Sequence, residues 1–181
     1  SYNNIKFSET FGDFGFAMKV KVDTLRDLGC SLSPNNAFYI LNGVETLGIR
    51  MKKHTSNALK VADFLNQHSL VESVSYAGLK NNENYKLSKK YFPLGPGSVF
   101  TIKLKNGYNS CISLVENVNL FSHVANIGDT RSLIIHPAST THSQLSKTEK
   151  IKSGAGPDVI RLSIGLENVE DIIEDLDKSI K

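Results

Sequence analysis

Apolar residues recur at three- and four-residue steps over much of the first third of the chain, and this spacing predicts helices. Residues 1–9 are polar and lack the period, so we expect a loop there. The first helical segment covers residues 11–28. Gly29 is well placed to end it, because glycine readily adopts the left-handed conformation found at helix C-termini.

A second and longer helical segment follows Pro34 and extends to residue 65. The same spacing continues on both sides of a charged patch. We expect one long helix, in which Gly43 and Gly48 permit a bend or the close approach of another backbone. A helix of this length commonly bridges two parts of a larger structure, so we expect the chain to be part of a longer protein.

Beyond residue 70, short runs of alternating apolar and polar residues predict strands, separated by segments with helical spacing. Strands are expected at 71–76, 98–104, 133–135 and 158–165, with a further short candidate at 123–127. Helices are expected at 81–91, 111–120 and 168–181, with Asn168 as the cap of the last one. This order predicts an α/β (α+β-like) fold in which a small sheet is covered by helices on one face.

Composition excludes several classes of protein. The formal net charge is +3, from 21 basic and 18 acidic residues, and lysines cluster only in pairs, so we expect no nucleic-acid partner. No apolar run approaches the roughly 18 residues that would span a bilayer, and there is no signal-peptide pattern, so we expect no membrane partner. Cys30 and Cys111 lie far apart among apolar neighbours, which favours buried free thiols and a cytoplasmic location.

The stretch GDTRSLIIHPASTTH, from Gly128 to His142, has the layout of a ligand-binding loop. A short apolar run opens at His136-Pro137 into a loop of small hydroxyl residues, and such loops commonly deliver side chains to a ligand. The loop continues to residue 157 with at most one helical turn, at 147–151, and loops of that length are usually functional. A simple strand end is the alternative interpretation.

Arg161 is the strongest single candidate for binding an anion. In the strand at 158–165 it shares a face with Val159 and Ser163, opposite the apolar residues Ile160 and Leu162. A guanidinium in this position can hold a carboxylate through two parallel hydrogen bonds. The residue pattern leaves equally open a surface arginine paired with a nearby acid.

Other patterns that could carry chemistry are weaker. His136 and His142 flank the hydroxyl loop but have no further ligand at suitable spacing, so we expect no metal site. Asp129, His136 and Ser139 could form a hydrolytic triad, but the G-x-S-x-G elbow is missing. The glycine-rich stretch 95–98 precedes a strand and lacks the helix N-terminus that binds phosphate. No lysine lies in surroundings apolar enough to make it a nucleophile.

Three blocks of the sequence resemble the Cys/Met-metabolism family of pyridoxal-phosphate (PLP) enzymes. They are LRDLGCSLSPNNAFYILNGVETLGIRMKKHTSNALKVADFL (residues 25–65), NIGDTRSLIIHPASTTH (126–142) and IRLSIGLE (160–167). Their order and spacing fit the C-terminal part of these enzymes. Asn126 and the STTH ending of the second block make the chain most similar to the O-acetylhomoserine sulfhydrylase (O-acetylhomoserine aminocarboxypropyltransferase) branch.

The resemblance implies a fold and a substrate site. The fold would be the C-terminal small domain of a type I PLP-dependent transferase, with a small, mostly antiparallel sheet covered by helices and preceded by a long helix. Arg161 matches the arginine that grips the substrate α-carboxylate. Asn126 matches a position whose main or side chain helps to hold that carboxylate, and Thr141 matches a loop residue close to the substrate.

The resemblance also implies residues that this sequence does not contain. In the family, the lysine that carries PLP lies in a Ser-x-Thr-Lys motif upstream of the matching region. The phosphate-binding glycines and the aspartate that pairs with the pyridine nitrogen are upstream too. We therefore expect no catalytic residue, no covalently bound PLP and no turnover in this chain alone. Residues 1–32 would be the tail of the large PLP-binding domain, and residues 33–181 the substrate-binding small domain.

For the complete enzyme, the resemblance implies replacement at the γ-carbon with PLP as electron sink. Acetate leaves O-acetylhomoserine and sulfide or a thiol adds, giving homocysteine or methionine, in a homodimer or homotetramer. Two alternatives stay open. One is a cystathionine γ-synthase or γ-lyase of the same family, and the other is a non-catalytic interaction module that reuses this domain.

Overall fold

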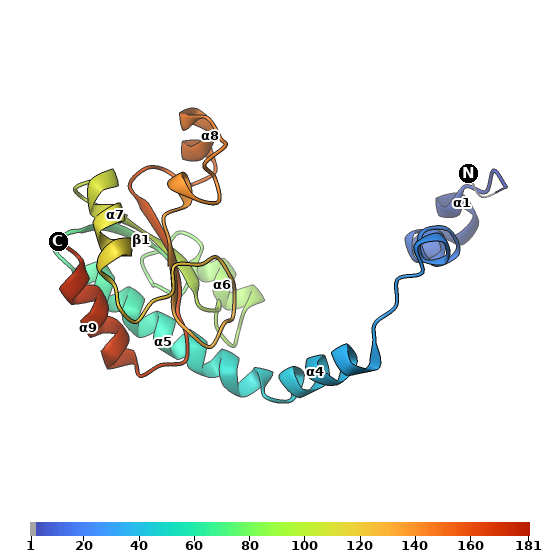
Figure 1. Ribbon diagram of the computed structural model, residues 1–181, viewed down its shortest axis with the longest axis horizontal. Coiled ribbons are helices and arrows are strands. Elements are labelled where there is room, and N and C mark those ends of the chain that lie inside the picture. Colours follow the sequence, from blue (N-terminus) through green and yellow to red (C-terminus); the bar gives the residue numbers. More distant parts are fainter. Residues whose placement is uncertain (1–2) are drawn as a thin grey trace. The chain divides into compact units, whose positions relative to one another are not determined.

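The computed structural model describes residues 3–181, which divide into two compact units (Figure 1). The first unit ends at Glu45 and is helical. Its elements are α1 (Phe7–Phe11), the 3-10 turn η1 (Gly12–Phe14), α2 (Gly15–Lys19), the π-helical turn η2 (Val20–Thr24), α3 (Leu25–Leu28) and α4 (Pro34–Glu45). Of the loop predicted for residues 1–9, residues 1–2 lie outside the described part of the chain, and the prediction is wrong from Phe7 onwards, because α1 begins there.

The predicted helix end at Gly29 is confirmed. Gly29 adopts the left-handed conformation (φ 65°, ψ 20°), and its amide donates to the carbonyl of Leu25 at 2.8 Å. A residue with a Cβ atom would be strained in this conformation, which is why glycine suits the position.

The predicted long helix is interrupted at Thr46, so it consists of α4 and α5 (Leu47–Gln67). Thr46 adopts φ −100° and ψ −1°, and it accepts the Arg50 amide at 3.1 Å and the Arg50 Nε at 3.2 Å. The β-branched threonine lies between Gly43 and Gly48, so helix propensity is low on both sides of the break. Apolar spacing continues unchanged across one turn residue, so the pattern could not reveal the interruption.

The second unit, Thr46–Lys181, is built on a four-stranded sheet of order β1-β2-β4-β3 in which every neighbouring pair is antiparallel. The strands are β1 (Val71–Ser75), β2 (Val99–Leu104), β3 (Leu133–Ile135) and β4 (Val159–Ser163). The small antiparallel sheet expected from the sequence is therefore confirmed. The strand candidate at 123–127 is wrong, because this segment forms a loop beside the isolated parallel bridge between Ser122 and Leu133.

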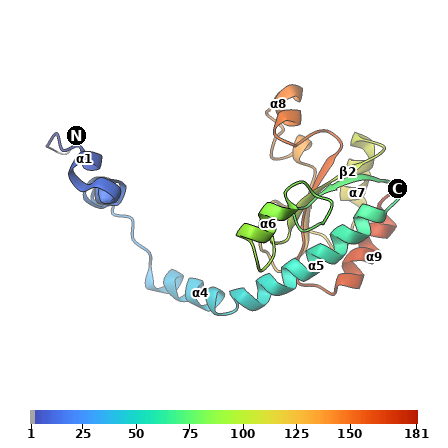
Figure 2. The same ribbon diagram turned by 180° about the vertical axis from the view of Figure 1, so that it is seen from behind.

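Three helices cover one face of the sheet: α5, α7 (Tyr108–Asn117) and α9 (Val169–Ser179) (Figures 1 and 2). The core lies between these helices and the apolar sides of β2 and β4. Its members include Ala58, Val61, Leu65, Phe100, Ile102, Leu114, Ile160, Leu162, Ile172 and Leu176. The predicted alternation is confirmed along β2, and the predicted stripe of the last helix is confirmed by the buried Val169, Ile172 and Leu176. In β4 the predicted apolar face is buried, but Val159 and Ser163 on the opposite face are buried too.

The remaining elements lie in the connections. They are α6 (Tyr85–Tyr91), the 3-10 turn η3 (Pro137–Ser139) and α8 (Lys147–Lys152). The Asn168 side chain caps α9 by accepting the Glu170 amide at 3.2 Å, as predicted. Across residues 3–181, the structure contains no helix with the length and apolar character needed to cross a membrane.

Candidate functional site

Arg161 lies at the middle of β4, on the face of the sheet opposite the core helices. Its register partners are Thr101 on β2 and Ile135 on β3. Its neighbours Ile160 and Leu162 point the other way and are fully buried. The Arg161 side chain is half-buried. Its backbone is held in the central strand, and its side chain lies on the face of the sheet that α5, α7 and α9 do not cover.

The guanidinium of Arg161 has a neutral partner. Its Nη2 donates to the main-chain oxygen of Asn126 at 3.2 Å. Within residues 3–181, no aspartate or glutamate lies within ion-pair distance of Arg161. The alternative of a surface arginine paired with a nearby acid is therefore not observed, and the positive charge is available to an anion.

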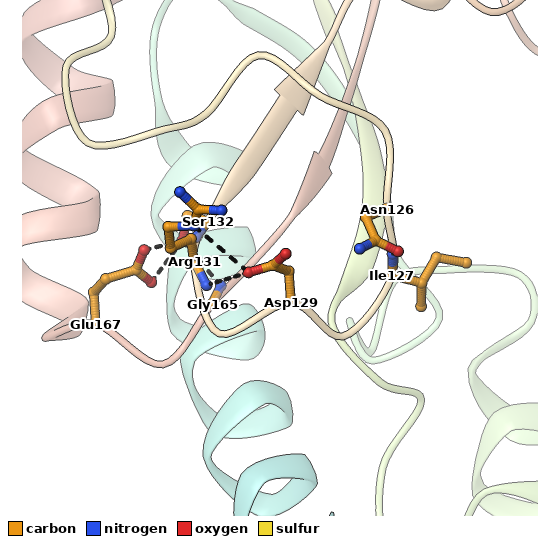
Figure 3. A network of polar contacts seen from close by, with 7 residues as sticks. All are labelled: Asn126, Ile127, Asp129, Arg131, Ser132, Gly165 and Glu167. Carbon is orange, nitrogen blue, oxygen red and sulfur yellow. Dashed lines mark hydrogen bonds and ion pairs between the residues drawn. The ribbon is translucent and has the colours of Figure 1, made fainter. Parts of the chain in front are cut away.

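The main-chain carbonyl of Asn126 contacts Arg161, whereas the Asn126 side chain makes a local hydrogen bond within its own turn. The Oδ1 of Asn126 accepts the amide of Ile127 at 2.8 Å (Figure 3). Further along the same segment, Oδ1 of Asp129 accepts the amide of Arg131 at 3.1 Å. The main chain of Asn126 is thus the part that lies at the arginine.

Thr141 lies in the loop that follows η3 and is exposed. Its Oγ1 lies 2.9 Å from Nδ1 of His142. The structure brings Arg161 and Asn126 together, and no hydrogen bond among the described residues joins Thr141 to either of them.

His136 closes the base of the long loop at 137–157. It is 1% exposed, with Nε2 3.0 Å from the carbonyl of Pro157 and Nδ1 2.9 Å from Oγ of Ser139. The carbonyl can only accept, so Nε2 carries a hydrogen; in the neutral imidazole, Nδ1 then accepts the Ser139 hydroxyl. The ring of Tyr108 packs edge-on against the imidazole, with 5.1 Å between the two ring centroids. His136 is therefore a structural residue that joins the two ends of this loop.

The structure assembles neither a hydrolytic triad nor a metal site in the part of the chain that it describes. The structure brings Ser139 and His136 together, with Oγ 2.9 Å from Nδ1. The other ring nitrogen lies at the Pro157 carbonyl in place of a carboxylate, and Asp129 accepts the Arg131 amide instead. Residues 3–181 contain no group of three or more histidine, cysteine, aspartate or glutamate side chains that could hold a metal ion.

Nucleophilic side chains are unsuited to covalent chemistry here. Every lysine that the structure describes is exposed except Lys150, which is half-buried, so none is desolvated. Burial, with a smaller contribution from the charge of Asp158, raises the pKa of the Cys111 thiol to about 12. The prediction that both thiols are buried is wrong for Cys30, which is exposed because it lies in the link between α3 and α4.

The sequence analysis missed a network that ties the segment 126–132 to the end of β4 (Figure 3). The carboxylate of Glu167 accepts the amide of Ser132 at 2.6 Å and its hydroxyl at 2.9 Å. The same hydroxyl oxygen accepts the amide of Gly165 at 2.9 Å, and Ser132 is fully buried. A Cβ on Gly165 would lie 2.5 Å from the backbone of Arg131 and Ser132, so the close approach requires glycine.

Asn57 joins this network to α5. Its side-chain amide is buried and donates to the carbonyl of Gly165 at 3.0 Å and to that of Glu167 at 2.9 Å. Gly165 and Glu167 lie in the block IRLSIGLE, so the sequence did mark these two residues. Only their hydrogen bonds show that they hold the structure together, which the sequence cannot distinguish from binding a ligand.

Comparisons with known proteins support the resemblance. Residues 7–181 match the family model of Cys/Met metabolism PLP-dependent enzymes. The chain is 47% identical over 190 residues to O-acetyl-L-homoserine sulfhydrylase of Leptospira meyeri, covering 100% of this chain and 43% of that protein. It is 43% identical over 179 residues to O-acetyl-L-homoserine sulfhydrylase 1 of Thermus thermophilus, covering 99% and 42%.

A solved structure shares this fold. It is the crystal structure of an O-acetylhomoserine (thiol)-lyase of Campylobacter jejuni, with N'-pyridoxyl-lysine-5'-monophosphate, which is 45% identical at a TM-score of 0.86. The match covers 94% of this chain and 41% of that one. The chain thus spans about two fifths of the length of its relatives. By its sequence and its fold, the chain belongs to the Cys/Met-metabolism family of PLP-dependent enzymes.

Proposed function

We propose that this chain supplies the substrate-carboxylate site of a PLP-dependent O-acetylhomoserine sulfhydrylase. The observation that carries the proposal is the Arg161 guanidinium, held by the carbonyl of Asn126 at 3.2 Å and without an acidic partner among the described residues. An uncompensated guanidinium on a rigid central strand favours a carboxylate ligand, because it can donate two parallel hydrogen bonds. The names of the relatives, O-acetyl-L-homoserine sulfhydrylases, support the reaction class.

Each site residue has a distinct part in this proposal. Arg161 binds the α-carboxylate of O-acetylhomoserine, and the Asn126 carbonyl orients the guanidinium by accepting one of its hydrogens. Thr141, on the exposed loop after η3, lies near the substrate in the complete protein. Sulfide or a thiol would then replace acetate at the γ-carbon.

The described residues fit the substrate end of the site rather than the attachment of the cofactor. PLP, when bound in the complete enzyme, supplies the electron sink for the replacement. No described lysine has the desolvated surroundings that a Schiff base requires. We therefore propose that this chain alone neither binds PLP covalently nor turns over. Residues 1–32 as part of the large domain, the homo-oligomer and the cytoplasmic location likewise stay predictions.

The test of the proposal is Arg161→Lys in the full-length gene product loaded with PLP. A lysine keeps the charge but loses the planar fork, so KM for O-acetylhomoserine should rise about 10- to 100-fold. Arg131→Lys is the matched control, because Arg131 is an exposed arginine on the neighbouring segment, with its Nε 3.8 Å from Asp129. An unchanged KM in Arg161→Lys would remove Arg161 from the site.

The rival assignments are separated by two simple assays. Sulfide and cysteine compared as nucleophiles distinguish a sulfhydrylase from a cystathionine γ-synthase or γ-lyase. Borohydride reduction of the 181-residue chain with PLP, followed by intact mass, tests the expectation about the cofactor. A single stoichiometric adduct would place the PLP lysine in this chain and contradict the proposal.

A further inference from the structure

We propose that Glu167 and Ser132 are positioning residues for the carboxylate site. They would hold the segment 126–132 so that the Asn126 carbonyl meets the Arg161 guanidinium. The inference rests on the proposed function and deepens it, because it assigns the orientation of Arg161 to residues that do not touch the substrate.

Hydrogen bonds to Glu167 and its neighbours fasten the segment 126–132 at one end. Glu167 accepts both the amide and the hydroxyl of Ser132, at 2.6 and 2.9 Å, and the Ser132 hydroxyl oxygen accepts the Gly165 amide at 2.9 Å (Figure 3). The Leu166 amide donates to the carbonyl of Thr130 at 2.8 Å. Four hydrogen bonds within three residues, around a fully buried serine, leave this end little freedom.

The contacts at the two ends of the segment close a ring. At its other end, the segment meets Arg161 through the Asn126 carbonyl, at 3.2 Å from Nη2. Arg161 and Glu167 belong to the same stretch of chain, β4 and the residues that follow it. The ring therefore runs from Arg161 along β4 to Glu167, across to Ser132, back along the segment to Asn126 and across to Arg161. A shift at the Ser132 end must be accommodated at the Asn126 end, only six residues away.

This ring is anchored in the core through α5. Asn57 on α5 is buried and donates to the carbonyls of Gly165 and Glu167, at 3.0 and 2.9 Å. Its neighbour Ala58 and the residue Val61 on the next turn of α5 are fully buried in the core cluster. The ring that ends at the Asn126 carbonyl is thus joined to a helix packed in the buried core.

Substitutions at Glu167 can distinguish a role in holding the segment from a role of its negative charge. A glutamine of the same shape can accept the Ser132 amide on its oxygen and donate its NH₂ to the Ser132 hydroxyl oxygen. Alanine can do neither. If Glu167 acts by holding the segment, Glu167→Gln should restore most of what Glu167→Ala loses.

The experiment measures kcat and KM for O-acetylhomoserine in the full-length, PLP-loaded protein. Glu167→Ala should raise KM about 5- to 30-fold with kcat changed less than about threefold, because the loss concerns ground-state binding of the carboxylate. Glu167→Gln should recover most of the affinity. Glu170→Ala, an exposed glutamate in the first turn of α9, is the matched control and should behave as wild type.

A second readout does not need the reaction. In the 181-residue chain, the ¹H–¹⁵N resonance of Arg161 Nε and the hydrogen exchange of the Ile127 amide report on the two groups at the far end of the segment. Both should change in Glu167→Ala, return towards wild type in Glu167→Gln and stay unchanged in Glu170→Ala.

The outcomes separate the two proposals. A raised KM in Arg161→Lys with an unchanged KM in Glu167→Ala would overturn the inference and leave the proposed function standing. An unchanged KM in Arg161→Lys would count against the proposed function itself. If Glu167→Ala fails to fold, Ser132→Ala is measured instead, since it removes only the hydroxyl bonds. An unmoved KM and an unmoved Arg161 resonance in that variant would also overturn the inference.

Discussion

At the scale of single residues, the tightest constraint near the site is the backbone approach at Gly165. A Cβ there would lie 2.5 Å from the Arg131 carbonyl carbon and the Ser132 nitrogen. The same Cβ would also lie 2.3 Å from Oε2 of Glu167. Gly165→Ala should therefore lower the free energy of unfolding by about 1–3 kcal/mol, because the Arg131 and Ser132 contact atoms are backbone and cannot move aside, and the Glu167 carboxylate is held by Ser132. Urea denaturation of the 181-residue chain measures the change.

The control is the same substitution at Gly48 on α5, where an added Cβ meets nothing within 4 Å. Because alanine is the better helix former, Gly48→Ala should be neutral or stabilising by up to about 1 kcal/mol. Equal effects at Gly48 and Gly165 would mean that the close approach at Gly165 has no energetic importance.

At the scale of elements, the long loop at 137–157 depends on one imidazole. His136→Phe keeps the volume of the ring but removes the bonds to Ser139 and Pro157, at 2.9 and 3.0 Å. We expect the loop to open locally, so that trypsin cleaves at the exposed Lys147 and Lys152 faster than in wild type. Limited proteolysis followed by mass spectrometry identifies the cut sites.

Ser139→Ala serves as the graded comparison, because it removes only the bond to Nδ1 and keeps the bond between Nε2 and the Pro157 carbonyl. Its cleavage rate should fall between those of wild type and His136→Phe. Cleavage of His136→Phe at the wild-type rate would show that apolar packing, including that of Tyr108, holds the loop without these bonds.

At the scale of the whole molecule, the two thiols report separately on the two units. Cys30 in the first unit is exposed, whereas Cys111 is buried in the core of the second, and burial raises its pKa to about 12. At pH 8, iodoacetamide should label one thiol in the native chain and both in denaturant, as counted by intact mass. Rapid labelling of both thiols in the native chain would contradict the buried position of Cys111.

Because of the Cys111 thiol, we expect the free energy of unfolding to decrease at alkaline pH. Its pKa is raised from the ordinary 9.0, so the unfolded state releases the proton first as pH increases. The contribution of the protonated thiol is complete below pH 9 and is lost as pH rises towards 12. Cys111→Ala should show a smaller loss of stability over that range.

Local pattern predicted the elements and their faces well. The apolar faces of β2 and β4 and the stripe of α9 form the observed core, and Arg161 lies on the opposite face, as its place in the alternation required. The blocks of sequence were sufficient for the family. The failures include the start of α1 at Phe7 within a predicted loop, where a short helix has too few residues to show a period. The others are the break at Thr46, the loop at 123–127 and the exposed Cys30, where one backbone turn or the absence of a covering element outweighs the apolar pattern.

By itself, then, the sequence determined which residues face the core, which strand carries the arginine and which family the chain belongs to, because periodicity and motifs are local properties. Only the tertiary structure decided what Arg161 meets. Antiparallel pairing puts β4 between β2 and β3, and the return of the segment 126–132 along the end of β4 brings a carbonyl 35 residues away to the guanidinium. The roles of Ser132, Glu167 and Asn57 arise from the same packing, since hydrogen bonds between distant segments depend on how layers stack, which no local pattern records.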